Sequence, residues 1–228
     1  RAIAAGVKRL VYASSSSVYG SQEKVCTEAS PTRPETAYAE TKLAAEQACM
    51  MFGEASALEV TAVRSATCCG PAPRMRLDTI VNVFSKQAYF DGTITVFDGT
   101  QFRSNIHVQD VAELYALLLE APAELIDGQV FNAVREYGSA LSIAGQVIRL
   151  VGFHGRPAAI DVDHTKKDTR QYRMSGVKAV KVLGWRPARS IAKAVEDNFR
   201  WFAQGGVPDP NDDLYWNTRR MKDVVTKG

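Results

Sequence analysis

The sequence predicts an α/β protein with a mostly parallel sheet, because β-rich runs and helical segments alternate along most of its length. Two apolar, β-rich runs, at residues 9–14 and 58–65, flank a segment of good helix formers at 36–54. The 228 residues, 46% of them apolar, are enough for one large domain or two small ones. In the last third the strands become short and sparse, which indicates a smaller lobe that covers the ends of the sheet.

Each element carries a local signal. Thr36 is placed to cap the helix at 36–54, and the stretch Gly-Pro-Ala-Pro at 70–73 breaks the chain after the second strand. His107 is expected to end a strand, and Asp110 is expected to cap the helix that follows it. The remaining predicted segments are a loop at 15–34, strands at 94–97, 104–107, 129–133 and 158–161, and helices at 77–90, 108–120, 139–151, 175–183 and 191–202.

Charge is distributed unevenly along the chain. The net charge of +3 divides into −3 over residues 1–150 and +6 over residues 151–228. A basic C-terminal part suits an anionic ligand such as a diphosphate, although a solvated surface explains it equally well. No basic helix and no interleaving of aromatic and basic residues argues for nucleic acid.

Several protein classes lack support in the sequence. No apolar run approaches the ~18 residues that a membrane span needs, and the N-terminus lacks the regions of a signal peptide. The cysteines Cys26, Cys49, Cys68 and Cys69 form no C-x-x-C pair, and with the three histidines they show no zinc-ligand spacing. Reduced thiols in a cytoplasmic protein are therefore the expectation.

Tyr38 and Lys42 are the first candidate catalytic residues. They are four residues apart, so on a helix they share one face. A lysine ammonium beside a tyrosine favours phenolate, and a serine from the run at 14–17 would hydrogen-bond the same substrate oxygen. Such a set moves a proton on and off a C–O group. On spacing alone, two residues that merely share a face of an amphipathic helix are the better explanation.

The sequence around Tyr38 and Lys42 resembles that of a known family. Residues 9–20 read RLVYASSSSVYG and residues 38–42 read YAETK, and similar blocks continue to about Pro187. In this order they resemble the extended short-chain dehydrogenase/reductases, and more narrowly their nucleotide-sugar epimerase/dehydratase branch. The resemblance implies a Rossmann-like, doubly wound parallel sheet with a smaller substrate-binding lobe. The implied cofactor domain covers 1–72 and 104–135, and the implied substrate lobe covers 73–103 and 136–228.

The resemblance also implies the roles of individual residues. Tyr38 is the implied general base, Ser15 the implied catalytic serine, and Lys42 the residue that binds the nicotinamide ribose and keeps Tyr38 deprotonated. Ser14 and Ser65 are implied to lie against the cofactor, which is NAD. The substrate is implied to be a nucleotide-diphosphate sugar. The implied substrate-binding residues are Ser15, Ser16, Asn82, Arg103 and Arg170.

Residues 16 and 17 favour one reaction within that family. The 4,6-dehydratases of the family carry Asp-Glu at this place and the decarboxylases commonly carry a Glu at the second position, whereas this chain has Ser16 and Ser17. The resemblance therefore implies a UDP-sugar 4-epimerase with a transient 4-keto sugar and tightly held NAD. The alternatives are an NAD(P)-dependent nucleotide-sugar reductase or dehydrogenase, and a non-catalytic binding protein that retains the fold.

The sequence departs from the family at two places. No glycine turn of the G-x-G-x-x-G kind follows a strand, so we expect the first part of the cofactor domain, roughly three βα steps, to be missing. Thr67, Cys68 and Cys69 stand where the family often has Asn or Tyr, so the sugar pocket is expected to differ. Relatives pair through the helix of Tyr38 and Lys42, which implies a homodimer.

Overall fold

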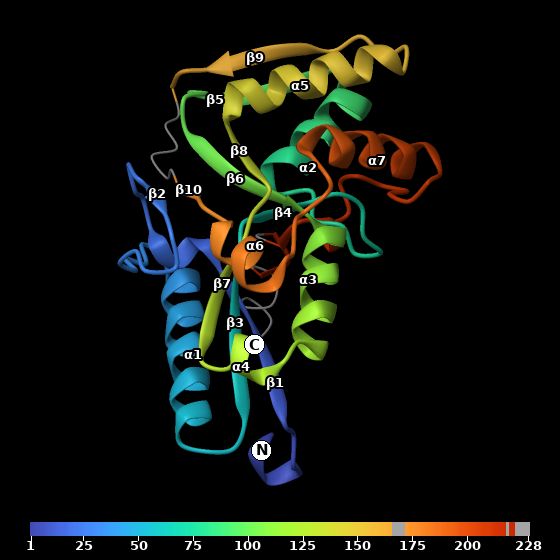
Figure 1. Ribbon diagram of the computed structural model, residues 1–228. Coiled ribbons are helices and arrows are strands. Elements are labelled where there is room, and N and C mark those ends of the chain that lie inside the picture. The colour runs from blue at the N-terminus through green and yellow to red at the C-terminus, as the bar shows by residue number, and fades with distance from the viewer. Residues whose placement is uncertain (166–171, 218, 222–228) are drawn as a thin grey trace.

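A parallel sheet lies at the centre of the molecule. A computed structural model describes residues 1–165, 172–217 and 219–221. The central sheet has the order β1-β3-β7 and consists of β1 (Arg9–Ser15), β3 (Glu59–Ser65) and β7 (Gln129–Ala133). Figure 1 shows α1 (Ala37–Glu54) and α3 (Val108–Glu120) on opposite sides of this sheet. The predicted α/β class is therefore confirmed.

The other elements are mostly short and belong largely to the part of the molecule above the central sheet in Figure 1. Among the described residues, no helix is both long and apolar enough to cross a membrane. The remaining strands are β2 (Val25–Cys26), β4 (Thr67–Cys69), β5 (Thr93–Phe97), β6 (Phe102–His107), β8 (Glu136–Ser139), β9 (Ala159–Asp163) and β10 (Arg173–Met174). The remaining α-helices are α2 (Ile80–Lys86), α4 (Ala123–Ile126), α5 (Ala140–Phe153), α6 (Val177–Leu183) and α7 (Ile191–Ala203).

The long elements lie where the sequence predicts them. β1 and β3 cover the two predicted buried strands, and α1 covers the predicted helix at 36–54. Thr36 caps this helix, because its Oγ1 accepts the backbone N–H of Ala39 at 3.2 Å. These elements carry a strong local pattern, which explains why the sequence locates them.

Two predicted segments differ from the structure. The helix predicted at 77–90 begins only at Ile80, and the N–H of Leu77, ahead of it, donates to the carbonyl of Tyr215 at 2.9 Å. Its last turn is a π-helical turn, Gln87–Asp91. The predicted loop at 15–34 contains a 3₁₀ turn, Ser16–Tyr19, and the short strand β2, which pairs with β10. The chain before α2 and the strand β2 thus bond to partners far away in the chain, whereas the turn at Ser16–Tyr19 is held locally by Ser15.

Two hydrophobic cores hold the molecule together. One lies between the central sheet, α3 and α6, and the other lies among α2, α5 and α7. The predicted division into a cofactor domain and a substrate lobe remains a prediction. Met174, Ala179 and Trp185, which that division places in the substrate lobe, pack into the core of the central sheet.

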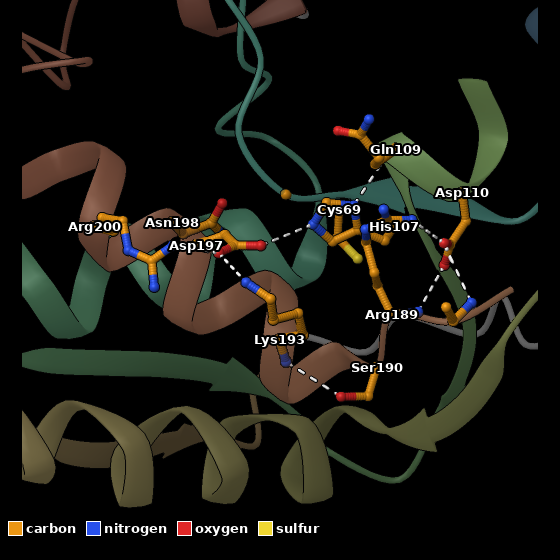
Figure 2. A network of polar contacts seen from close by, with 12 residues as sticks. Cys69, His107, Gln109, Asp110, Arg189, Ser190, Lys193, Asp197, Asn198 and Arg200 are labelled. Atoms are coloured by element: carbon orange, nitrogen blue, oxygen red, sulfur yellow. Dashed lines mark hydrogen bonds and ion pairs between the residues drawn. The ribbon is translucent and has the colours of Figure 1, made fainter. Parts of the chain in front are cut away.

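A network of polar contacts joins the end of β6 to α7. Figure 2 shows the ring of His107 with Asp197 of α7 on one side, and the two atoms Nε2 and Oδ2 are 3.5 Å apart. Asp197 also forms ion pairs with Lys193 at 2.5 Å and Arg200 at 3.4 Å. His107 Nδ1 accepts the backbone N–H of Gln109 at 3.1 Å, so the proton of the neutral ring lies on Nε2.

The prediction that Asp110 caps α3 is wrong. His107 occupies the cap position and its ring accepts the backbone N–H of Gln109, whereas Asp110 lies inside the first turn. The fully buried carboxylate of Asp110 accepts the backbone N–H groups of Ala188 and Arg189 at 3.2 and 3.0 Å and the Arg189 guanidinium at 2.6 Å. Asp110 therefore fastens the segment before α7 to α3 (Figure 2).

We expect the folded state to lose stability as the pH falls below about 6.5, the ordinary pKa of histidine. Burial lowers the pKa of His107; the carboxylates of Asp197 and Asp110 oppose this effect, and the cations of Arg189 and Lys193 reinforce it. The unfolded chain then takes up a proton that the folded chain refuses, so stability is complete above pH 6.5 and falls toward the lowered pKa. The slope contributed by this group is at most about 1.4 kcal/mol per pH unit.

The measurement is urea unfolding at pH 7.5 and at pH 5.5 for the wild type, His107→Gln and His154→Gln. His107→Gln should flatten the dependence, and His154→Gln, at an exposed position, should retain it. An unchanged slope in His107→Gln would contradict the assignment.

Candidate functional site

The carboxyl ends of β1, β3 and β7 meet at one edge of the central sheet, because the strands are parallel. Ser15 lies opposite Ser65 in one ladder, and Ser65 lies opposite Ala133 in the next. A cavity of about 820 Å³ opens at this edge, and both serines line it. Since residues of α2, β5 and β6 also line it, the cavity lies between the sheet and the lobe built on α2, α5 and α7.

Tyr38 and Lys42 line this cavity from the first two turns of α1. Lys42 Nζ donates to the carbonyl of Ala13 at 2.8 Å and lies 5.8 Å from the centroid of the Tyr38 ring. The lysine thus ties α1 to the strand that carries the serines. Because Tyr38 is 57% exposed, a ligand in the cavity has access to it.

The four serines at 14–17 all line the cavity. Ser15 Oγ accepts the backbone N–H of Ser17 at 3.2 Å and its hydroxyl at 2.9 Å, which holds the turn after β1 in place. Ser16 is buried beside them. Ser14 Oγ is buried and has no hydrogen-bond partner among the described residues, so it is available to a ligand.

The opposite wall contains two of the predicted substrate-binding residues. Arg103, on β6, is buried and donates to the carbonyl of Phe102 at 2.9 Å. Asn82, on α2, is committed to the protein: its Oδ1 accepts the N–H of Gly70 and the amide of Asn198, both at 3.0 Å. Asn82 therefore shapes the wall of the cavity. Arg170 lies outside the described residues.

The cavity lining also includes hydroxyl groups that the sequence did not single out for binding, among them those of Thr67, Tyr115 and Tyr172. Thr67 Oγ1 and Tyr172 Oη are 3.2 Å apart, and the two residues come from distant parts of the chain. Tyr115 hydrogen-bonds Ser65, and burial raises the pKa of Tyr115 to about 12, so its hydroxyl stays protonated. Val108, Val111 and Tyr115 are three and four residues apart, so they lie on one face of α3, and all three line the cavity. This spacing is visible in the sequence.

The cavity favours an anion over a cation. Its described lining includes the cations Lys42, Arg74, Arg76 and Arg103 and the carboxylates Glu35 and Asp78. Both carboxylates are already engaged: Glu35 accepts the N–H and the hydroxyl of Ser21, and Asp78 pairs with Arg76 at 2.9 Å. Guanidinium groups bind phosphate oxygens in a bidentate manner, so a phosphate-bearing ligand suits this lining.

Comparison with known proteins agrees with this geometry. Residues 1–133 match the model of the NAD dependent epimerase/dehydratase family. A UDP-glucose 4-epimerase from Lactobacillus helveticus is 28% identical over 222 residues, which cover 86% of this chain and 64% of that protein. A UDP-glucuronate 4-epimerase from Thermodesulfobacterium geofontis is 32% identical over 206 residues, which cover 86% of this chain and 59% of that protein.

Solved structures confirm the Rossmann-like fold. The structure of MoeE5 in complex with UDP-glucuronic acid and NAD has a TM-score of 0.77 and 27% identity, and the match covers 90% of this chain and 68% of that one. The present chain spans less than two thirds of the length of the two 4-epimerases.

We expect Gly70→Ala to destabilise the protein by about 1–3 kcal/mol, since glycine is required at this point of the cavity wall. Gly70 has a φ of +100°, and a Cβ there would lie 2.7 Å from Nε2 of His107. The control is Gly145→Ala in α5, where nothing lies within 4 Å of the added Cβ; it should stabilise the helix by about 0.5–1 kcal/mol. Urea unfolding measures both, and equal effects of the two variants would refute the steric argument.

Proposed function

Because this chain belongs to the NAD dependent epimerase/dehydratase family, whose cofactor is NAD, we propose that it is a nucleotide-sugar epimerase that inverts C4 of a UDP-sugar. The observation that carries the proposal is the arrangement of Ser15, Tyr38 and Lys42 along one wall of a single cavity, next to arginines that suit a diphosphate. The two 4-epimerases that resemble the chain support the same reaction.

The residues at the sheet edge fit one end of the cofactor. Ser14 Oγ is buried without a partner, and the ammonium of Lys42 gives one of its three protons to Ala13 and retains donors for a ligand. Together with Tyr38 and Ser65 they would hold NAD. When bound, NAD supplies the acceptor and donor of the hydride in a redox-neutral reaction.

The chain's own side chains handle the proton. Tyr38 Oη would take the proton from the C4 hydroxyl of the sugar and return it after the ring has turned over. The hydroxyl of Ser15 would donate to the same oxygen. Lys42, held against β1 by the carbonyl of Ala13, supplies a positive charge beside the Tyr38 ring.

Two features favour epimerisation over elimination of water. Elimination needs an acid and a base beside the sugar, and the turn after β1 offers Ser16 and Ser17 there. Among the described residues of the lining, Glu35 and Asp78 are the carboxylates, and both are bonded to neighbouring protein groups. Arg103 and Ser16 would bind the substrate, and we propose the same for Arg170. Asn82, which is bonded to Gly70 and Asn198, would act on the substrate by shaping the wall that faces it.

We expect Tyr38→Phe to lower kcat by about 10²–10⁴-fold with little change in KM, because the variant lacks the hydroxyl that moves the proton. The measurement is conversion of UDP-glucose or UDP-glucuronic acid to its C4 epimer by the full-length protein, followed without added NADH. Tyr137→Phe is the matched control, since Tyr137 is partly exposed and lies outside the cavity lining.

The same assay, repeated with NADH or NADPH added, identifies the rival functions. Stoichiometric consumption of the added NAD(P)H would overturn epimerisation in favour of a reductase. Binding of a UDP-sugar without any turnover would favour a binding protein that retains the fold.

We further propose a homodimer that pairs through α1. Met51 and Phe52 on this helix are 58% and 55% exposed, which leaves apolar side chains on its outer face. Sedimentation at twice the monomer mass is expected, and Met51→Glu should reduce it to the monomer; a wild-type monomer would refute the proposal.

All four cysteines are free, so we also propose a reducing, cytoplasmic location, which cell fractionation tests.

A further inference from the structure

A buried ion pair joins α1 to β3 outside the cavity. Arg64 Nη2 lies 2.6 Å from Oε1 of Glu46, and Arg64 Nε donates to Oε2 of the same carboxylate at 3.1 Å. The two side chains are only 8% and 4% exposed. Neither residue lines the cavity, so the reaction proposed above makes no direct use of them.

Tyr19 extends the pair into a network of four elements. Its hydroxyl accepts from Arg64 Nη1 at 3.1 Å and donates to Oδ1 of Asn132 at 2.7 Å. Tyr19 is fully buried and ends the 3₁₀ turn after β1, and Asn132 lies in β7. One guanidinium thus holds α1, β3 and the turn together, and the tyrosine adds β7.

Short stretches of helix, turn and strand connect the network to Tyr38, Lys42 and Ser15. On α1, Glu46 lies one turn beyond Lys42 and two turns beyond Tyr38, on the same face of the helix. On the other side, Tyr19 lies in the turn that Ser15 caps. Arg64 directly precedes Ser65 in β3. A shift at Glu46 or Tyr19 would therefore move Tyr38 relative to Ser15.

Arg64 and Tyr19 keep their protons. Burial by itself would lower the pKa of Arg64, but the hydrogen bonds to Glu46 and Tyr19 and the negative charge of Glu46 outweigh it and raise that pKa. Burial also raises the pKa of Tyr19, so its hydroxyl remains protonated and can donate to Asn132. A group that keeps its protons is suited to hold geometry and unsuited to transfer a proton.

We propose that Glu46, Arg64 and Tyr19 are positioning residues that set the distance between the hydroxyl of Tyr38 and that of Ser15. The bidentate pair fixes how far α1 slides along β3, and Tyr19 fixes the turn that carries Ser15 against the same guanidinium. This inference rests on the proposed function, because it assigns the network to the alignment of those two side chains.

The test compares Glu46→Gln and Tyr19→Phe with Glu59→Gln in the full-length protein carrying its cofactor. Glu59 of β3 pairs with Arg9 of β1 at 2.6 Å, at the end of β3 opposite to Arg64. A misplacement of about 1 Å is enough for a 10²-fold loss, so both network variants should lose 10-fold or more in kcat with KM within about twofold. Glu59→Gln should keep both constants.

A readout without turnover accompanies the kinetics. Amide hydrogen exchange over 37–46 should be faster in Glu46→Gln and Tyr19→Phe and unchanged in Glu59→Gln. If Glu46→Gln fails to fold, Tyr19→Phe decides the question, because it removes one hydroxyl and leaves the buried ring and the ion pair in place. A purely structural role would lower the melting temperature and leave kcat unchanged well below it.

Tyr38→Phe separates the two levels of failure. If Tyr38→Phe retains turnover, the proposed function itself is wrong. If Tyr38→Phe is inactive while Glu46→Gln and Tyr19→Phe keep the wild-type kcat, only the positioning role is overturned.

Discussion

The parallel register of β1, β3 and β7 is the constraint on which the rest of the site depends. Because the strands run in one direction, each must be followed by a crossover that returns to the starting edge, and α1 is the crossover between β1 and β3. The helix therefore begins at the edge where β1 has just ended. The first turns of α1 and the last residues of β1 therefore lie at the same edge of the sheet, and for this reason Tyr38 and Lys42 line the same cavity as the serines. The direction of the strands brings the candidate catalytic residues together before any side chain interacts.

Buried charges then fasten the layers that this topology brings together. Arg64 and Glu46 do so beneath the cavity, and Asp110 with Arg189 does so where α3 meets the segment before α7. Each pair is hydrogen-bonded on several sides, which offsets the free energy of removing its charges from water. Loss of Arg64 would leave the carboxylate of Glu46 buried and uncompensated, at about 3–5 kcal/mol. Such pairs add less to stability than to the choice of one arrangement between neighbouring elements.

The sequence located the parts of the molecule whose signal is local. The strand at 9–14, the helix at 36–54 with its Thr36 cap, and the serine run beside Tyr38 all carry their pattern within a few residues, and the structure brings the serines, Tyr38 and Lys42 to one cavity. What the sequence missed depends on partners far along the chain. β4 has only three residues, and its pairing with β6 makes it a strand. The carboxylate of Asp110 accepts the backbone N–H of Arg189, almost eighty residues later in the chain. The hydroxyl pair of Thr67 and Tyr172 joins two such distant segments.

The pairing of β2 with β10 makes the order of synthesis matter. Val25 and Arg173 lie side by side in the folded protein, yet Val25 leaves the ribosome before Arg173 and the long stretch between them have been made. Until β10 has been made, β2 has no strand to pair with. The chain just after β2 carries Glu28, whose carboxylate accepts the N–H of Asn132 at 2.8 Å, so this segment also has a partner in β7. A nascent chain can thus assemble β1, α1 and β3 early, while the part of the cavity lining that Tyr172 supplies waits for the final third. Tyr38 and Lys42 can therefore take their places beside the serines before the lining of the cavity around them is complete.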